Sequence, residues 1–299
     1  MYDVIIIGAG TAGLTAAIYT QRAGKTALLL EAKAYGGQIV NTPDIENYPG
    51  YKHISGFEFA TNLYEQAKEL GAQLKYERAL SIRDGGKEKK TVVTNAGEYE
   101  CKAVILATGA KNRPLGLENE QKMIGSGVSY CATCDGMFFR GREVAVVGGG
   151  NTAIEDASFL SNYCSKVYLI HRRDAFRGDA KGVKALKEKD NVEFVLNSAV
   201  TKLLGKFRLE GIEVTNKLDG SVKTIPVAGL FVAVGQQPEN ESFSDVVSLD
   251  EGGYIAAGED CRTGTEGIFT AGDCRTKTVR QLTTAAADGA VAALAACKS

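Results

Sequence analysis

The sequence predicts an α/β fold made of two similar units, the second of which is inserted into the first. An apolar run at residues 4–7 leads into one glycine motif, and another run at 143–147 leads into a second. Each motif opens a helical stretch that is followed by a further apolar strand. After the second unit ends, a strand at 267–271 most simply completes the first sheet. We therefore expect two Rossmann-like, three-layer ββα nucleotide-binding domains.

The composition is that of a globular protein without a strongly charged surface. Hydrophobic residues make up 44% and charged residues 24% of the 299 residues, and the net charge is −1. This balance gives no electrostatic reason to expect a nucleic acid or a membrane surface as a partner. The chain opens directly into a strand, and no apolar run approaches the length of about 18 residues that a membrane span needs. We expect a cytoplasmic location.

Each residue of the first glycine motif has a mechanical task. Gly8 makes a tight turn, Gly10 lets a pyrophosphate approach the helix N-terminus, and Gly13 allows close packing of helix and strand. The strand at 26–30 ends at Glu31, whose carboxylate can accept hydrogen bonds from ribose hydroxyls. Strand, turn, helix, strand and terminal acid together indicate a dinucleotide site rather than a structural turn.

The second motif places cations where the first places an acid. An equal number of positions separates the first glycine of each motif from the end of the following strand, where Glu31 stands in one copy and His171 in the other. Arg172 and Arg173 follow, and guanidinium groups suit a 2′-phosphate. We expect FAD at the first site and NADPH rather than NADH at the second. The alternative is that these positively charged residues form a solvated surface turn. The expected NADPH residues are Gly148, Gly150, Asn151, Thr152, Ala153, His171, Arg172, Arg173 and Arg177.

Two cysteines lie just before the second glycine motif. Cys131 and Cys134 form a C-x-x-C pair, which can be a redox disulfide, half of a zinc site or two incidental residues. A zinc site needs four ligands, whereas the other five cysteines are scattered and the chain has only two histidines, so no metal is expected. The place between two nucleotide motifs favours a redox-active pair. Asp135 supplies a carboxyl group that can carry a proton for a leaving thiolate.

These motifs define the expected domain limits. The FAD-binding domain is discontinuous and takes residues 1–113 and 243–299. The NADPH-binding domain takes residues 114–242 and carries the cysteine pair. Because two connections cross at one place, a hinge between the domains is geometrically possible.

Further motifs complete a known pattern. They are Gly36-Gly37-Gln38, Glu46-Asn47-Tyr48-Pro49-Gly50, Ala107-Thr108-Gly109, Ala271-Gly272-Asp273 and Arg280-Gln281. With the motifs above, the chain resembles the low-molecular-weight, bacterial-type NADPH-dependent thioredoxin reductases over essentially its whole length. Overall similarity suggests a clostridial-type member. The family more often has Ser at Thr152 and a residue other than Cys at Cys274, and neither departure touches the chemistry.

The resemblance implies a mechanism. Reducing equivalents would pass from NADPH to FAD by hydride transfer, then to the disulfide, and then to thioredoxin through a mixed disulfide. In the family the C-terminal cysteine of the pair faces the flavin, which here is Cys134, and the N-terminal one, Cys131, attacks the partner. Asp135 is the implied general acid. Family members rotate the NADPH domain between two orientations and are homodimers.

The resemblance also implies the contacts to FAD. Gly37, Gln38 and Asn47 would lie at the isoalloxazine, although Gln38 and Asn47 could equally be loop-capping residues. The full set of expected FAD residues is Gly8, Gly10, Gly13, Glu31, Gly37, Gln38, Asn47, Ala107, Thr108, Gly109, Gly272, Asp273, Arg280, Gln281 and Leu282. Cys274 is expected to be a buried spacer and Cys297 to be inert.

Two alternatives stay open at this point. One is a related flavoprotein disulfide reductase with another partner, such as a peroxiredoxin or a glutaredoxin-like protein. Peroxiredoxin-linked flavoproteins carry an extra N-terminal redox domain, and the bacillithiol-type and ferredoxin-dependent relatives lack the C-x-x-C pair. The other alternative is a flavin redox sensor that is not an enzyme. Steady turnover with a substrate would distinguish the sensor from a reductase.

Overall fold

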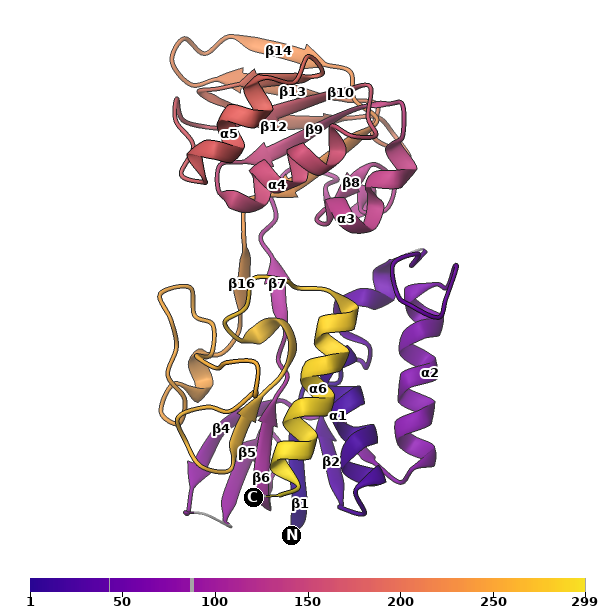
Figure 1. The fold of residues 1–299 in the computed structure, drawn as a ribbon, viewed down its shortest axis with the longest axis vertical. Coiled ribbons are helices and arrows are strands. Elements are labelled where there is room, and N and C mark those ends of the chain that lie inside the picture. Colours follow the sequence, from indigo (N-terminus) through magenta and orange to yellow (C-terminus); the bar gives the residue numbers. More distant parts are fainter. Residues whose placement is uncertain (43, 87–88, 299) are drawn as a thin grey trace. The chain divides into compact units, whose positions relative to one another are not determined.

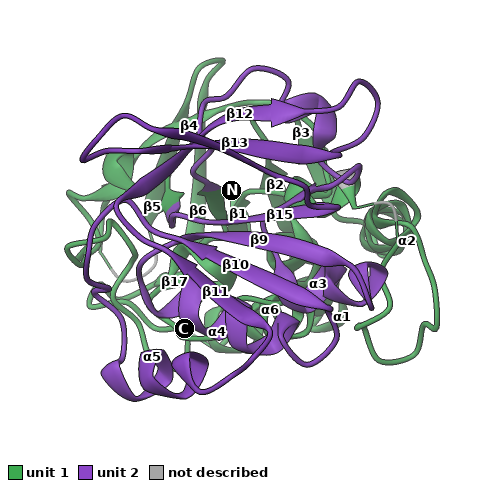
Figure 2. Ribbon diagram, turned by 90° about the horizontal axis from the view of Figure 1, so that it is seen from above, with its two compact units in different colours: residues 1–111, 237–299 green, residues 112–236 purple. Residues whose placement is uncertain are grey.

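The computed structural model describes residues 1–42, 44–86 and 89–298. It divides into two compact units, shown in green and purple in Figure 2: Met1–Lys111 with Gln237–Ser299, and Asn112–Gln236. The domain limits expected from the sequence, after residues 113 and 242, lie a few residues beyond these unit limits. The chain crosses from one unit to the other in two strands, β7 (Ala110–Asn112) and β16 (Gln236–Pro238), which pair with each other.

The first unit is built on one sheet. Its order is β3 (Gln73–Lys75), β2 (Ala27–Leu30), β1 (Tyr2–Ile7), β6 (Glu98–Leu106), β5 (Lys90–Thr94) and β4 (Ala79–Asp84), with β17 (Ile268–Thr270) also paired to β6. The strand β17 lies beyond the inserted unit in sequence, and its parallel pairing with β6 confirms that the C-terminal segment completes the first sheet.

The antiparallel strands of the first unit differ from the expected separate layer. β4 and β5 join the main sheet, because the nine-residue strand β6 pairs with β5 along its first half and with β1 and β17 along its second. A single long strand thus belongs to both the parallel and the antiparallel parts of the sheet.

Helices and loops cover both faces of the parallel strands. The helices are α1 (Thr11–Arg22), α2 (Gly56–Glu69) and α6 (Leu282–Ala296), with short 3-10 turns η1 (Gly37–Asn41), η4 (Glu241–Phe243) and η5 (Gly272–Cys274). Side chains alternate along β1, so Ile6 packs toward α1 and α6 while Ile5 packs toward the segment that holds Phe243. Helices α1 and α6 lie side by side (Figure 1), and a Cβ at Gly289 of α6 would lie 2.3 Å from Ala12 O.

The second unit has three layers. Its parallel sheet runs in the order β11 (Val192–Val195), β10 (Lys166–Ile170), β9 (Glu143–Gly148), β15 (Gly229–Ala233) and β8 (Val128–Ser129). An antiparallel sheet of β12 (Ser198–Leu204), β13 (Gly211–Asn216) and β14 (Val222–Ile225) covers one face. The other face carries α3 (Ala132–Asp135), η3 (Gly136–Phe139), α4 (Asn151–Leu160) and α5 (Ala180–Lys187). The turn η2 (Gln121–Met123) precedes β8. This is the ββα order expected from the sequence.

Across the described residues, the helices are too short or too polar to be membrane spans.

Candidate active site

The first glycine turn leaves an open position where a nucleotide would lie. Gly8 has φ +105°, and a Cβ there would lie 2.3 Å from Ala107 O, while a Cβ at Gly13 would lie 1.8 Å from Gly8 O. These two glycines are therefore required by backbone packing. A Cβ at Gly10 would meet nothing closer than 4.0 Å. The space beside Gly10, at the N-terminus of α1, is where a pyrophosphate can approach the backbone.

Glu31 is held beside this turn by two backbone groups. Its Oε2 accepts a hydrogen bond from the Ala9 N–H at 2.9 Å, and its Oε1 accepts one from the Lys33 N–H at 2.9 Å. Both carboxylate oxygens keep further lone pairs for other donors. The acid at the end of β2 is thus fixed next to the glycine turn in an orientation suited to ribose hydroxyls.

Asp273 carries a buried oxygen that points to a ligand. Burial raises the pKa of Asp273, while Lys277 and Arg280 act to lower it. Its Oδ1 is buried and has no hydrogen-bond partner among the described residues. A buried carboxylate oxygen without a donor is costly, so a hydroxyl-bearing group bound there would satisfy it. The residues therefore fit the ribityl or ribose part of FAD.

A buried ion network, which sequence reasoning missed, supports the turn that holds Asp273. Asp288 accepts from Gly272 N at 2.9 Å, from Arg275 Nε at 2.8 Å and from Lys277 Nζ at 2.8 Å. The side chain of Arg275 is 1% exposed and that of Asp288 is 6% exposed. The sequence feature that could have indicated this network is a single acid, Asp288, within the otherwise Ala-rich apolar run of α6.

Two pairs of contacts in the first unit involve other expected FAD residues. Asn47 Nδ2 donates to Gln281 Oε1 at 3.2 Å, and Gln281 caps the N-terminus of α6, which begins at Leu282. Gln38 Nε2 donates to the Ala110 carbonyl. These contacts join loops that are far apart in sequence. Asn47 and Gln38 thus each have a protein partner, and their contact with the isoalloxazine stays a prediction.

A second missed residue, Asn240, connects two of the expected FAD motifs. It is fully buried. Its Oδ1 accepts from Thr108 Oγ1 at 2.7 Å, and its Nδ2 donates to Cys274 O at 2.9 Å. Asn240 thereby fixes the 107–109 turn against the 272–274 turn. Cys274 is also buried, and its thiol lies near the Leu106 and Ala271 carbonyl oxygens. Its role as a spacer stays a prediction.

The second glycine turn repeats the pattern of the first. A Cβ at Gly148 would lie 2.3 Å from Ala233 O, whereas a Cβ at Gly150 would meet nothing within 4 Å. Asn151 and Thr152 begin α4, and Asn151 Oδ1 accepts from the Asp179 N–H at 2.7 Å. The Arg177 N–H donates to Gly149 O at 2.8 Å, which brings Arg177 to the edge of the turn.

His171 differs from its neighbours in charge and exposure. The residue is 6% exposed, and its ring stacks on Phe176 with centroids 5.0 Å apart. Burial lowers the pKa of His171, and Arg172 and Arg173 lower it further, so the imidazole is neutral at pH 7. Its Nε2 has no partner within the described ranges. Arg172, Arg173 and Arg177 are exposed, so these three side chains, and not His171, supply the positive charge at this turn.

The cysteine pair forms a disulfide in the second unit. Cys131 follows β8, Cys134 lies in α3, and their sulfur atoms are joined. Asp135 ends α3, and burial raises its pKa. The hydroxyl of Ser129, a third residue that sequence reasoning missed, lies 2.6 Å from Asp135 Oδ2. A disulfide next to a carboxyl group whose pKa is raised by burial is suited to thiol–disulfide exchange with proton transfer.

The other five cysteines, all among the described residues, are not in disulfides. Cys101, Cys164, Cys261 and Cys274 are buried, and Cys297 is partly exposed. Burial raises the pKa of Cys101 to about 12 and that of Cys164 to about 11. Because the thiolate is the reactive form, burial makes the Cys101 and Cys164 thiols poor nucleophiles beside the 131/134 pair.

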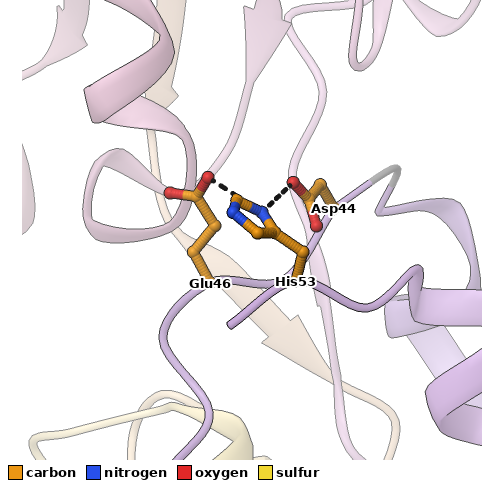
Figure 3. A group of neighbouring side chains, drawn as sticks. All are labelled: Asp44, Glu46 and His53. Atoms are coloured by element: carbon orange, nitrogen blue, oxygen red, sulfur yellow. Dashed lines mark hydrogen bonds and ion pairs between the residues drawn. The ribbon is translucent and has the colours of Figure 1, made fainter. Parts of the chain in front are cut away.

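His53 lies in an exposed acidic loop. Its Nδ1 is 2.9 Å from Asp44 Oδ2 and 3.4 Å from Glu46 Oε1 (Figure 3). The hydrogen bond with Asp44 raises the pKa of His53, whose side chain is 67% exposed. Exposed ion pairs of this kind contribute little to stability. His53 fits the role of a surface residue that closes its own loop.

Comparison with known proteins decides the family. Residues 2–289 match the pyridine nucleotide-disulphide oxidoreductase family. The chain belongs to this family. The thioredoxin reductase of Listeria monocytogenes is 43% identical over 293 residues, which cover 98% of this chain and 92% of the relative. A bifunctional thioredoxin reductase/thioredoxin of Mycobacterium leprae is 41% identical over 98% of this chain and 65% of the relative.

Solved structures agree with this membership. The crystal structure of thioredoxin reductase from Streptococcus pyogenes has a TM-score of 0.94 and 41% identity, covering 99% of this chain and 97% of that one. The resemblance drawn from the motifs is therefore confirmed. As a member of this family, the chain is an NADPH-dependent flavoprotein disulfide oxidoreductase, and FAD and NADPH are its cofactors.

Proposed function

We propose that this chain is a thioredoxin-disulfide reductase, which passes reducing equivalents from NADPH through FAD and the Cys131/Cys134 pair to oxidised thioredoxin. The observation that carries the proposal is the disulfide itself, with Asp135 directly after it. The names of the relatives support thioredoxin as the partner, and the Mycobacterium leprae relative carries both names on one chain.

The cofactors are assigned to the two units by their residues. In the first unit, Glu31 and the unpartnered Asp273 Oδ1 support FAD binding beside Gly10. In the second unit, the open position at Gly150 and the exposed Arg172, Arg173 and Arg177 support NADPH binding. FAD, when bound, supplies the hydride acceptor between NADPH and the disulfide.

The roles within the pair follow the family pattern. Cys134 is the flavin-side thiol, Cys131 attacks the partner, and Asp135 is the general acid. Met137 and Phe138, which follow the pair, are 42% and 45% exposed. An exposed apolar patch beside a reactive disulfide suits a protein partner better than a small thiol. This patch, Met137 and Phe138, is where we place the contact with thioredoxin.

The resemblance supports three further features. The second unit turns between two catalytic orientations, with β7 and β16 as the segments that bend. The protein is a homodimer and works in the cytoplasm. Light scattering on the purified protein tests the homodimer, because a mass of one chain would contradict it. A clostridial source stays a prediction.

The deciding experiment is NADPH oxidation by the flavin-loaded protein with and without the organism's own thioredoxin. We expect thioredoxin-dependent turnover that Cys131→Ser abolishes and that Cys297→Ser, a substitution at the partly exposed cysteine outside the pair, leaves intact. Flavin reduction without turnover would contradict the proposal and indicate another disulfide partner or a sensor. Proteins held as mixed disulfides on Cys131 of a Cys134→Ser variant would then identify that partner.

A further inference from the structure

Ser129 lies between the two parts of the disulfide site that must act together. It ends β8, is 3% exposed, and is not one of the residues expected from the sequence motifs. Its Oγ is 2.6 Å from Asp135 Oδ2 and accepts a hydrogen bond from the Cys131 N–H at 3.1 Å. One hydroxyl therefore contacts both the acid and the main chain of the attacking cysteine.

The hydroxyl has one hydrogen and two acceptors within reach. Besides Asp135 Oδ2, the Cys131 carbonyl oxygen lies 3.3 Å from Ser129 Oγ. A serine hydroxyl donates once and accepts up to twice. When Asp135 is ionised, the hydrogen of Ser129 points to the carboxylate, in a charge-assisted bond consistent with the 2.6 Å distance. When Asp135 is protonated, its own O–H can donate to Ser129, whose hydrogen then turns to Cys131 O.

We propose that Ser129 is a positioning residue that lets Asp135 change protonation state without moving, and that couples this state to the peptide of Cys131. Both arrangements satisfy every donor in the group, since Cys131 N–H donates to Ser129 in each. Only the Cys131 carbonyl gains or loses a hydrogen bond. The inference rests on the proposed role of Asp135 as the acid of the exchange.

The proton transfer balances without an additional reactant. During exchange one S–S bond breaks and another forms, and the leaving sulfur departs as a thiolate with its electron pair. The Asp135 O–H bond breaks, an S–H bond forms on that thiolate, and Asp135 is left as a carboxylate. The Ser129 hydrogen then turns from Cys131 O to the new carboxylate. No electron enters or leaves in this step.

Other titratable groups lie on the elements around this site. Helix α4 carries Glu155 and Asp156, Glu120 bonds Tyr130 beside Cys131, and Arg140 follows η3. Two influences shift the pKa of Asp135: burial raises it, and the hydrogen bond with Ser129 lowers it. Ser129 is thus the polar group through which the protonation of Asp135 can be changed by substitution.

The test compares the pH dependence of exchange in four proteins: the wild type, Ser129→Ala, Ser129→Thr and Asp135→Asn. The flavin-loaded enzyme is reduced with NADPH and mixed with 2-hydroxyethyl disulfide, whose leaving thiol needs a proton, and separately with thioredoxin. We expect a titration in the wild type that Asp135→Asn removes. Ser129→Ala should raise the midpoint of this titration by about one pH unit, which is a tenfold change in proton affinity. Ser129→Thr should restore the wild-type midpoint.

The double variant Ser129→Ala/Asp135→Asn separates coupling from a general structural effect. If Ser129 acts through Asp135, the double variant behaves like Asp135→Asn alone. A full Ser129→Ala effect in the Asp135→Asn background would overturn the inference, and so would an unchanged midpoint in Ser129→Ala. If the enzyme reduces 2-hydroxyethyl disulfide but not thioredoxin, the proposed partner is wrong, while the midpoints still decide the role of Ser129. Equal melting temperatures and flavin contents would show that the variants fold.

Discussion

Arg275 and Asp288 form a two-pronged ion pair in the interior of the first unit. Arg275 Nε lies 2.8 Å from Asp288 Oδ2, and Arg275 Nη2 lies 2.9 Å from Asp288 Oδ1. Asp288 Oδ2 also receives the Gly272 N–H, so the pair fixes the main chain directly before Asp273. The geometry of the expected FAD turn therefore depends on a residue in the middle of α6.

Replacing Asp288 by Asn should destabilise the protein and weaken FAD retention. Removing one partner of a buried ion pair leaves the other charge uncompensated, which costs about 3 kcal/mol. We expect a lower free energy of unfolding in urea and a higher Kd of the apoprotein for FAD, measured by flavin fluorescence. The exposed Asp245→Asn provides the matched control. Equal stability of the two variants would contradict the buried network.

Gly150 and Gly148 should respond to alanine in opposite ways. The Cβ added by Gly150→Ala would meet no atom within 4 Å. The free energy of unfolding should therefore fall by at most about 1 kcal/mol. The added methyl group would nevertheless occupy the approach of the pyrophosphate, and we expect NADPH affinity to fall at least about tenfold by calorimetry. Gly148→Ala would bring a Cβ within 2.3 Å of Ala233 O and should destabilise the fold. Unchanged NADPH affinity in Gly150→Ala would place the nucleotide elsewhere.

Alanine at Arg172 and Arg173 should discriminate between the two nicotinamide cofactors. Because guanidinium groups bind a 2′-phosphate that NADH lacks, the double variant should raise KM at least about tenfold for NADPH. The KM for NADH should change by less than about twofold. Lys206→Ala, which removes an exposed cation of the β12–β13 connection, is the control. Equal effects on the two cofactors would exclude the 2′-phosphate role.

Asp156 should make the stability of the second unit depend on pH. Burial, and then repulsion from Glu155, raises the pKa of Asp156 to about 7 from 3.8. Between pH 3.8 and about 7, Asp156 loses its proton in the unfolded chain but keeps it in the folded chain. The free energy of unfolding therefore falls as the pH rises through this range. Asp156→Asn should therefore raise the melting temperature by several degrees at pH 7 and little at pH 4. Equal gains at both pH values would contradict this assignment, and the exposed Asp190→Asn of the same unit is the control.

Local sequence patterns could predict the strands, the glycine turns and the inserted order of the chain. No other residue fits at Gly8, Gly13 and Gly148, because a Cβ there would lie too close to backbone atoms. These positions can be predicted from the glycine motifs without a structure. The C-terminal strand was also predictable, since an apolar run after the second unit had one sheet left to complete.

The supporting residues could not be predicted in this way. Ser129, Asn240 and Asp288 gain their roles from partners that the fold brings together, and none stands in a glycine or cysteine motif. The buried, neutral state of His171 depends likewise on Phe176 and on the close approach of Gly149. Spacing alone placed His171 with the cations, whereas its charge is set by desolvation that only the packed structure reveals.

The pairing of β17 with β6 also has a consequence for the order of synthesis. The second unit is a continuous segment and is complete once residue 236 has left the ribosome, whereas the first unit still lacks β17, the Asp273 turn and α6. Domains generally fold as units during translation. The inserted unit can therefore fold first, and the emerging first unit cannot complete its sheet or form the Asp273 turn until the segment after residue 236 has been made.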